Sequence, residues 1–445
     1  MTTRWARYGL EILFLLIAGH APAIAAGPRK STEMNGLSAF DLFSIAARAE
    51  AEGRKHDAYT LYDALARDPS VDIRSEARFR KAALLEAERR YREAAVLLRA
   101  ILDEAPKAAR VRLELARMLA LLGDEQAARR VLRQAEAAGL PPDVVATVQQ
   151  FSRALRSTRR FGGSAEISFA PDTNVNRATD SRTLDTVIAP LQLSKDAMQR
   201  SGAGIKTSAS LFARLPLSDK ISLLPRMSAV ASTYRDSGFN DMSGTALLGA
   251  EWRTGEDRLT PSLGSSWRRY GGKSYARTRT LTVDWLHHLG GVAQLLVNVS
   301  ASRVKYRSNS LQNGSLYDLR ISYERALAPS SGISLSIGST RQTAADPGYA
   351  TTSAGLSALG WKEIGGATLF LSVQGRRLKS DDRLFLFTDK RREWFVSGLA
   401  GATLRQLKVR GFAPVIRVGW DRNISTVGLY DYRRLFGEFG VARAF

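Results

Sequence analysis

The chain alternates most strictly between apolar and polar residues in Tyr317-Asp318-Leu319-Arg320-Ile321-Ser322-Tyr323-Glu324. Because successive side chains of a strand point to opposite faces, this stretch predicts a strand with one apolar and one polar face. The same alternation recurs in residues 333–338, 369–374 and 415–421. The second half of the chain is therefore predicted to form an extended sheet of this kind.

Counting strand-like runs from residue 164 to the end of the chain predicts about fourteen strands. We expect them to begin near residues 164, 203, 222, 242, 257, 275, 292, 313, 331, 349, 366, 392, 412 and 430. An outward apolar face suits a closed barrel in a bilayer, because lipid supplies no hydrogen bonds to an open sheet edge. The predicted fold is therefore an antiparallel transmembrane β-barrel, with a large soluble β-sandwich as the alternative.

The predicted connections alternate in length along the barrel segment. Short turns at 217–220, 254–257, 289–291, 330–332 and 364–366 follow even-numbered strands, and longer connections at 171–202, 306–312, 381–391 and 424–429 follow odd-numbered ones. Bacterial barrels combine an even strand count with short periplasmic turns and long external loops. Both ends of the barrel are thus expected on the periplasmic side. The terminal aromatic, Phe445, resembles the signal read by the outer-membrane barrel-assembly machinery.

The N-terminus carries the features of an export signal. Arg4 and Arg7 precede the apolar run 12–18, and Ala23-Ile24-Ala25 forms a small-x-small cleavage site. The apolar run is much shorter than the roughly 20 residues of a transmembrane helix. We therefore predict a signal peptide over residues 1–26.

Residues 37–160 are rich in Ala, Leu, Arg and Glu, with the 3–4 spacing of amphipathic helices. Ala94-Ala95 aligns with Ala127-Ala128 further along, and Ala58 precedes them at a similar spacing. Prolines follow at Pro69, Pro106 and Pro141, and the turns within the helix pairs carry Gly53, Glu88 and Gly123. This pattern resembles about three tetratricopeptide repeats over residues 41–142.

We accordingly predict a periplasmic repeat domain over residues 27–160, built as an α-solenoid, and an outer-membrane barrel domain over residues 161–445. Stacked repeats leave a concave surface, so the repeat domain is expected either to bind a protein or to act as a spacer or plug for the barrel.

Composition excludes several kinds of chemistry. The net charge is +22, but no recognition-helix or base-stacking motif accompanies it, so we do not expect nucleic-acid binding. The chain has no cysteine, which excludes disulfides, thiolate catalysis and zinc–sulfur sites. Beyond the signal segment the histidines are His56, His287 and His288, and consecutive strand residues cannot share one metal. We expect no cofactor, no metal and no catalytic residue.

Charged residues on the polar faces of the strands are candidates for the barrel lumen. Those that we single out are Asp318, Arg320, Glu324, Arg417 and Asp421. They are expected either to line a passage or to form interior salt bridges that stiffen the barrel.

One further stretch follows the first predicted strand, Glu166-Ile167-Ser168-Phe169-Ala170. It contains Pro171, Asp172, Asn174 and Asn176. Proline is expected to end the strand here, and Asp and Asn favour tight turns, so the residues alone predict a loop.

Together with the repeats and Phe445, this stretch resembles the surface lipoprotein assembly modifier (Slam) family, outer-membrane proteins of type XI secretion. The resemblance implies that the repeats receive a client in the periplasm and that the barrel passes it to the surface or inserts it. It implies surface lipoproteins or secreted soluble proteins as clients, and no catalysis. Other expected partners are periplasmic chaperones, the barrel-assembly machinery, and outer-membrane lipid and lipopolysaccharide, with the protein itself a monomer.

Two other functions stay open from the sequence. A repeat-containing porin that exports an exopolysaccharide would have a lumen of one charge sign with aromatic residues that stack on sugars. An outer-membrane lipid-modifying enzyme would depend on His287 or His288.

Overall fold

The computed structural model describes residues 38–122, 124–136, 160–404, 407 and 412–444. The chain divides into two compact units, a helical unit and a strand unit, which are described separately below. The predicted signal peptide, Gly123, Pro141 and Phe445 lie outside the described residues.

The described part of the helical unit consists of three successive helix pairs. The pairs are α2 (Ala39–Ala51) with α3 (Lys55–Leu65), α4 (Val71–Ala87) with α5 (Tyr91–Glu104), and α6 (Ala109–Leu121) with α7 (Glu125–Glu136). Of the alanines compared above, Ala58, Ala94 and Ala128 are fully buried, because only a small side chain fits where the paired helices touch. None of the described helices combines the length and apolarity that crossing a bilayer requires.

The turns within the pairs use a left-handed residue. Gly53 has a φ of 75°, and in the middle pair the equivalent residue is Arg89, with a φ of 60°. The expectation that Glu88 occupies this position is wrong, since Glu88 has a φ of −86° and caps α4. Counting back five residues from Ala58 gives Gly53, and the same count from Ala94 gives Arg89.

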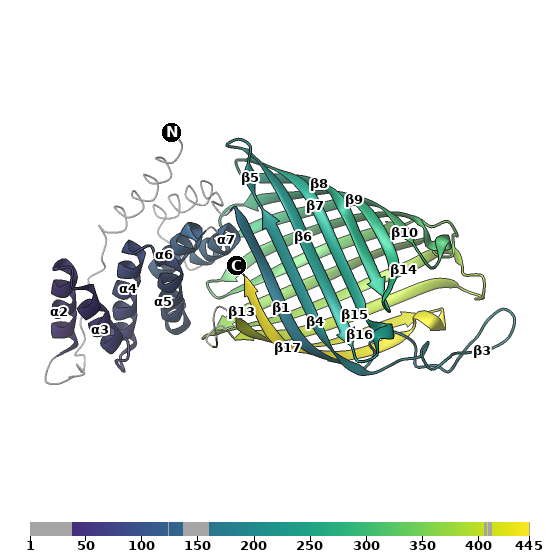
Figure 1. Cartoon of the computed structure of the whole chain (residues 1–445), viewed down its shortest axis with the longest axis horizontal. Helices are drawn as coiled ribbons and strands as arrows, with labels where there is room; N and C mark the ends of the chain where they lie inside the picture. The colour runs from purple at the N-terminus through teal and green to yellow at the C-terminus, as the bar shows by residue number, and fades with distance from the viewer. Residues whose placement is uncertain (1–37, 123, 137–159, 405–406, 408–411, 445) are drawn as a thin grey trace. The chain divides into compact units, whose positions relative to one another are not determined.

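Fourteen strands form one closed antiparallel barrel, as the sequence predicts (Figure 1). The strands are β1 (Phe161–Asp172), β4 (Gly202–Ala213), β6 (Ile221–Tyr234), β7 (Asp241–Thr254), β8 (Asp257–Tyr270), β9 (Lys273–Leu289), β10 (Ala293–Tyr306), β11 (Gly314–Ala328), β12 (Ser331–Gln342), β13 (Thr351–Ile364), β14 (Ala367–Arg383), β15 (Lys390–Leu404), β16 (Ala413–Ser425) and β17 (Tyr432–Ala444). Each predicted start lies within three residues of the observed one. The short β5 (Leu215–Pro216) extends the sheet beside β6.

The sheet closes because the first strand pairs with the last. β1 lies between β4 and β17 in antiparallel register, and β4 pairs in turn with β6. No edge strand remains in the ring, which excludes a β-sandwich. We call the junction of β1 with β17 the seam.

The two ends of the barrel differ in their connections. At the end where β1 starts and β17 finishes, the connections include two-residue turns such as 255–256 and 365–366. The opposite end carries the longer loops, among them 173–201, which contains β2 (Thr183–Leu184) and β3 (Leu191–Gln192) (Figure 1). We call these the turn end and the loop end. One connection at the loop end is short, since Gly271 and Gly272 alone join β8 to β9.

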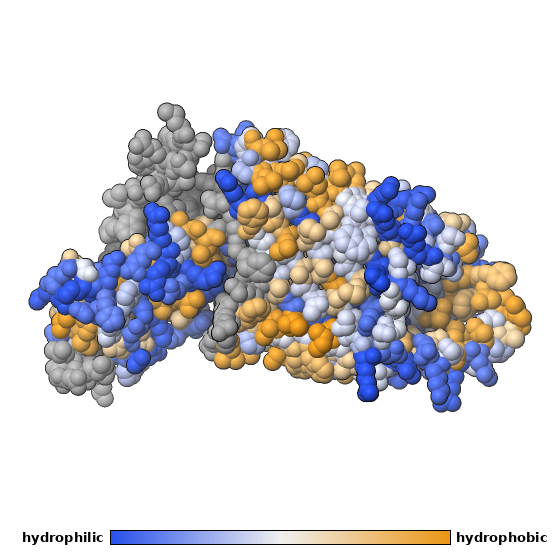
Figure 2. All heavy atoms as spheres, in the orientation of Figure 1, coloured by the Kyte–Doolittle hydropathy of each residue, from blue (hydrophilic) through white to orange (hydrophobic). Residues whose placement is uncertain are grey.

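The outer wall of the barrel is apolar. Every strand exposes at least one large apolar side chain: Ile167, Ile205, Met227, Leu248, Leu263, Leu281, Val299, Leu319, Leu335, Leu356, Leu371, Val396, Val418 and Phe439. Figure 2 shows apolar residues on the visible wall, with hydrophilic residues gathered toward the loop end. This continuous apolar band is the surface that hydrocarbon solvates.

A small apolar core joins the loops at the loop end. Leu184, Leu384, Phe387 and Val427 are buried against one another. Phe385, between two of them, is 78% exposed. The loops therefore pack together instead of lying free as separate segments.

Candidate functional site

A cavity of about 620 Å³ lies inside the barrel near the seam. It is lined from β1, β4, β6, β7 and β8 on one side and from β14, β15, β16 and β17 on the other. Strands that far apart around the ring share a cavity only in the lumen. Their polar faces therefore line the interior of the barrel.

Alternation explains which side chains enter this cavity. On β16, Val418 and Trp420 are exposed on the outer wall, so Asp421 points inward. On β17, Leu435 and Phe439 face outward, and Glu438 points into the cavity.

One chain of ion pairs runs across the lumen face of the seam. Glu438 of β17 accepts hydrogen bonds from Lys206 of β4 at 2.5 Å and from Arg417 of β16 at 2.8 Å. The same Arg417 guanidinium forms a two-pronged pair with Glu166 of β1, with Nη2 donating to Oε2 at 2.9 Å. Charges of both signs are thus matched across four strands.

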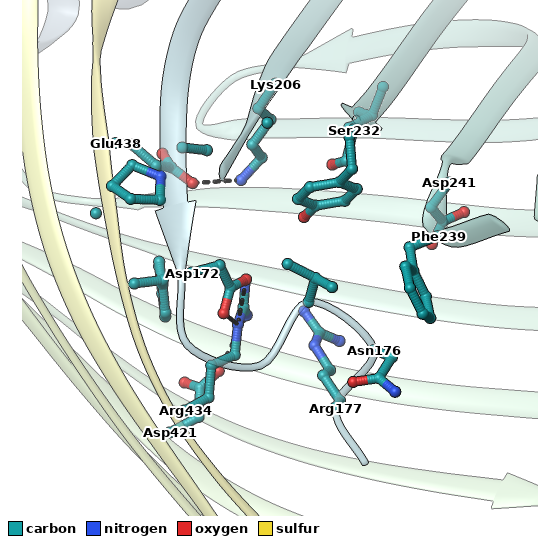
Figure 3. A pocket seen from close by; sticks show the side chains of 18 of the residues that line it. Asp172, Asn176, Arg177, Lys206, Ser232, Phe239, Asp241, Asp421, Arg434 and Glu438 are labelled. Atoms are coloured by element: carbon teal, nitrogen blue, oxygen red, sulfur yellow. Dashed lines mark hydrogen bonds and ion pairs between the residues drawn. The ribbon is translucent and has the colours of Figure 1, made fainter. Parts of the chain in front are cut away.

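A second group lies closer to the loop end (Figure 3). Arg434 of β17 donates from Nη2 to Oδ2 of Asp172 at 2.6 Å and from Nε at 2.8 Å. It also reaches Asp421 of β16 at 3.3 Å, and its guanidinium lies 4.2 Å from the centre of the Phe436 ring. The Asp172 side chain is only 2% exposed, so this pair is largely removed from solvent.

The stretch 171–176 lies at the same place and organises the first long loop. Asn174 is fully buried; its Nδ2 donates to the carbonyls of Ala178 at 2.8 Å and of Arg433 at 3.0 Å. Asn176 donates to the carbonyl of Met198 at 2.7 Å and accepts from the N–H of Arg200 at 3.1 Å. One amide therefore fastens the loop to β17, and the other closes its far end.

Pro171 does not end the first strand, contrary to expectation. β1 continues through it to Asp172 and keeps its register with β4, where Pro171 pairs with Ala203. Proline is tolerated here because its missing N–H faces only one of the two neighbouring strands.

The structure brings only some of the predicted residues together. Arg417 and Asp421 join the stretch 171–176, whereas Asp318, Arg320 and Glu324 lie on β11, away from this cavity. Asp318 accepts a hydrogen bond from Thr340 at 2.7 Å, and Glu324 accepts one from Gln294 at 2.6 Å. Interior salt bridges therefore involve Arg417 and Asp421 but, in the described part of the chain, no salt bridge forms at these three residues of β11.

Sequence reasoning missed four residues of the site: Glu166, Lys206, Arg434 and Glu438. Each is a charged residue on the polar face of a predicted strand, so alternation could have placed it in the lumen. Their pairing was not predictable, because Glu166 and Glu438 come from opposite ends of the barrel segment.

The histidines belong to a different place. His287 hydrogen-bonds to Asp257 at 2.9 Å and stacks on Trp285 at the turn end. Among the described residues no group of three His, Cys, Asp or Glu side chains has the arrangement of a metal site. The seam site itself consists of matched ion pairs.

Comparisons with known proteins agree with this architecture. A model of the surface lipoprotein assembly modifier family matches residues 162–441, and a tetratricopeptide repeat model matches residues 84–150. No curated protein sequence matches the chain.

Similar solved structures include outer-membrane proteins. A loop L8 deletion mutant of OmpT from Vibrio cholerae is 7% identical, with a TM-score of 0.39, and covers 64% of this chain and 99% of its own. The outer membrane channel DcaP of Acinetobacter baumannii is 10% identical, with a TM-score of 0.39, over 64% of this chain and 96% of its own. CdiB from Acinetobacter baumannii is 7% identical, with a TM-score of 0.36, over 65% and 61%.

The family match spans nearly all of the fourteen-stranded barrel, from its first strand to its last. The chain therefore belongs to the surface lipoprotein assembly modifier family and is an outer-membrane translocator-type barrel that follows a tetratricopeptide-repeat region.

Proposed function

We propose that this protein delivers surface lipoproteins from the periplasm to the cell surface through its barrel. The observation that carries the proposal is the family match over residues 162–441, together with a polar cavity inside the matched barrel. The repeat domain receives the client on the periplasmic side, and the barrel passes or inserts it. Folding of the client outside the cell makes the transfer irreversible.

The chemistry of the cavity supports a polypeptide client. Its wall carries Lys206, Arg376 and Arg434 as well as Asp241, Asp421 and Glu438. Side chains of both charge signs exchange hydrogen bonds with the backbone of a passing polypeptide. They do not bind a polypeptide of either net charge strongly.

The repeat domain has surface suited to receiving a protein. Stacked repeats present an extended concave face, and apolar side chains such as Phe40, Ile45 and Val96 stay exposed on the described helices. Periplasmic chaperones would hand over the client at this domain, and the barrel-assembly machinery would insert the barrel itself.

The same cavity meets one of the two expectations for export of an exopolysaccharide, since aromatic residues such as Tyr234, Tyr270 and Phe436 line it. Its charges argue against that function, because a polymer of uniform charge is best served by a lumen of a single sign, whereas this cavity carries both acidic and basic side chains. The enzyme alternative requires His287 to lie near the outer leaflet, where lipid substrate enters, whereas His287 lies at the turn end of the barrel beside Asp257.

The proposal is tested by comparing the surface proteome and the secreted proteins of cells with and without this chain. We expect one or a few lipoproteins to disappear from the surface of the deletion strain and to accumulate in the periplasm. A plasmid copy of the full chain should restore them. An unchanged surface proteome contradicts the proposal, and loss of a surface polymer instead supports the exopolysaccharide alternative.

A further inference from the structure

The seam differs from every other junction in the barrel. All other neighbouring strands follow each other in the chain and are joined by a turn or loop, whereas β1 and β17 are the first and last strands. Only hydrogen bonds and side-chain contacts hold the seam. It is the one junction that can separate without pulling a hairpin apart.

The backbone pairing of the seam is interrupted near the loop end. The N–H of Thr173 donates to the carbonyl of Leu435 at 3.0 Å, so the odd-numbered residues of β1 direct their backbone groups toward β17. Pro171, two residues earlier, faces Gly437 in this register and has no N–H to donate. The paired residues accordingly pass from Phe169–Phe439 directly to Asp172–Phe436.

A second proline shows why this interruption matters at the seam. The pairing of β7 with β8 skips in the same way next to Pro261, between Gly249–Ser262 and Trp252–Leu259. There the two-residue turn 255–256 joins the strands and keeps them together. At the seam no connection compensates for the missing bond.

On the lumen side, ion pairs link the two sides of the seam, which no turn or loop joins. Three of them join opposite sides of the seam: Asp172 with Arg434, Glu166 with Arg417, and Lys206 with Glu438. A polypeptide in the lumen that carries charged or polar groups competes directly for these side chains. The same polypeptide does not compete for the backbone N–H and C=O groups of the strands, because these groups are already paired within the sheet.

The outer side of the seam is apolar. Ile167 and Phe169 of β1 and Phe439 of β17 are about half exposed on the wall. When the strands part, the opening connects the polar lumen directly with the hydrocarbon of the outer leaflet.

We propose that the seam is the lateral exit through which the acyl chains of a lipoprotein client enter the outer membrane. This inference rests on the proposed function above. Exposing acyl chains to water is unfavourable in proportion to the number of CH₂ groups exposed. A side opening lets the polypeptide use the polar lumen while its lipid anchor stays in hydrocarbon throughout.

The absence of cysteine allows a direct test with engineered disulfides. Ile167 and Val441 are register partners across the seam, and Val299 and Leu319 are register partners across the β10–β11 junction. Directly paired strand residues have the separation that a disulfide needs. The double variants Ile167→Cys/Val441→Cys and Val299→Cys/Leu319→Cys therefore lock the seam and a matched ordinary junction.

The assay follows the lipoprotein that the deletion removes from the cell surface, detected with an antibody on intact cells. Under oxidation we expect the seam lock to reduce its display to the level of the deletion strain, with recovery after reduction by dithiothreitol. The control lock should display it as the wild type does. The inference is overturned if both locked variants display the lipoprotein as the wild type does. It is also overturned if both variants block its display equally.

A form of the same client without its lipidated cysteine separates the lipid anchor from the polypeptide. We expect this form to leave the cell even when the seam is locked. Its retention would assign the seam to the polypeptide and overturn the acyl-chain exit. Failure of the proposed function is distinguishable, because the lipoprotein would then reach the surface in the deletion strain as well.

A second pair of variants keeps the test independent of disulfides. Pro171→Ala supplies the N–H that faces Gly437, so we expect slower display of the lipidated client. Pro261→Ala, at the hairpin-joined junction, should leave the rate unchanged. Equal rates for Pro171→Ala and the wild type count against the seam as an exit.

Discussion

At the scale of single residues, Asp172 connects the loop stretch with the charged lumen. Its carboxylate accepts hydrogen bonds from Arg434 and, at 2.8 Å, from the backbone N–H of Asn174. The residue therefore links the last strand to the first and also fixes the start of the first long loop. The sequence identified Asp172 through its turn-forming neighbours, and the ion pair adds a second role.

We predict that Asp172→Asn destabilises the barrel. The substitution keeps an acceptor for the N–H of Asn174 but removes the charge that Arg434 pairs with, at a cost of roughly 2 to 3 kcal/mol. Asp318→Asn is the matched control, since hydroxyl groups surround that carboxylate, and its cost should be about 1 kcal/mol. Urea unfolding in detergent, followed by tryptophan fluorescence, measures both, and equal losses would contradict the prediction.

We predict that Asn174→Ala releases the first long loop. The change removes both donors to the carbonyls of Ala178 and Arg433 and the acceptor for the N–H of Ala178. Limited trypsin digestion should then cut faster after Arg177 and Arg182, while the heat-modifiable mobility of the barrel stays unchanged. Cleavage at the wild-type rate argues that other contacts hold the loop.

At the scale of secondary-structure elements, the alternation of apolar and polar residues predicts the strands. It does so because the outer and inner sides of the barrel wall meet different solvents. Pro171 is the exception, and its tolerance inside β1 depends on which neighbour its backbone faces. That direction is set by the pairing register, which local sequence does not contain.

The inter-helix turns give a test of the repeat alignment. Arg89 has a φ of 60°, which costs a side chain about 1 kcal/mol or more. Arg89→Gly should therefore raise the melting temperature of the helical circular-dichroism signal of the full-length protein. Gly53→Ala should lower it, through backbone strain alone, because nothing lies within 4 Å of the added methyl group. Shifts in the opposite directions would show that these turns are relaxed.

At the scale of the whole molecule, the closed ring brings residues from the start and end of the barrel segment into contact. Glu166 and Arg417 are paired only because β1 lies beside β17 and β17 beside β16. Closure thus creates both the seam and the ion pairs that span it.

Deletion of the helical repeats tests whether the two parts of the chain have separate roles. Without residues 38–136, we expect the barrel to insert into the outer membrane and to keep its heat-modifiable mobility, since its strands pair among themselves. The client should then accumulate in the periplasm, as in cells without the protein. Normal surface display by this variant would mean that the barrel alone selects the client.

The sequence by itself determined the fold class, the strand positions and the helix pairs, because side-chain periodicity reports the local solvent of each element. Asp172, Asn174, Arg417 and Asp421 were also found this way, from turn chemistry and from polar strand faces. Only the tertiary structure decided that these residues meet Arg434, Glu438 and Lys206 at one seam. The physical reason is that ring closure joins strands more than 200 residues apart in the chain, and no local pattern records which partner each charge will have.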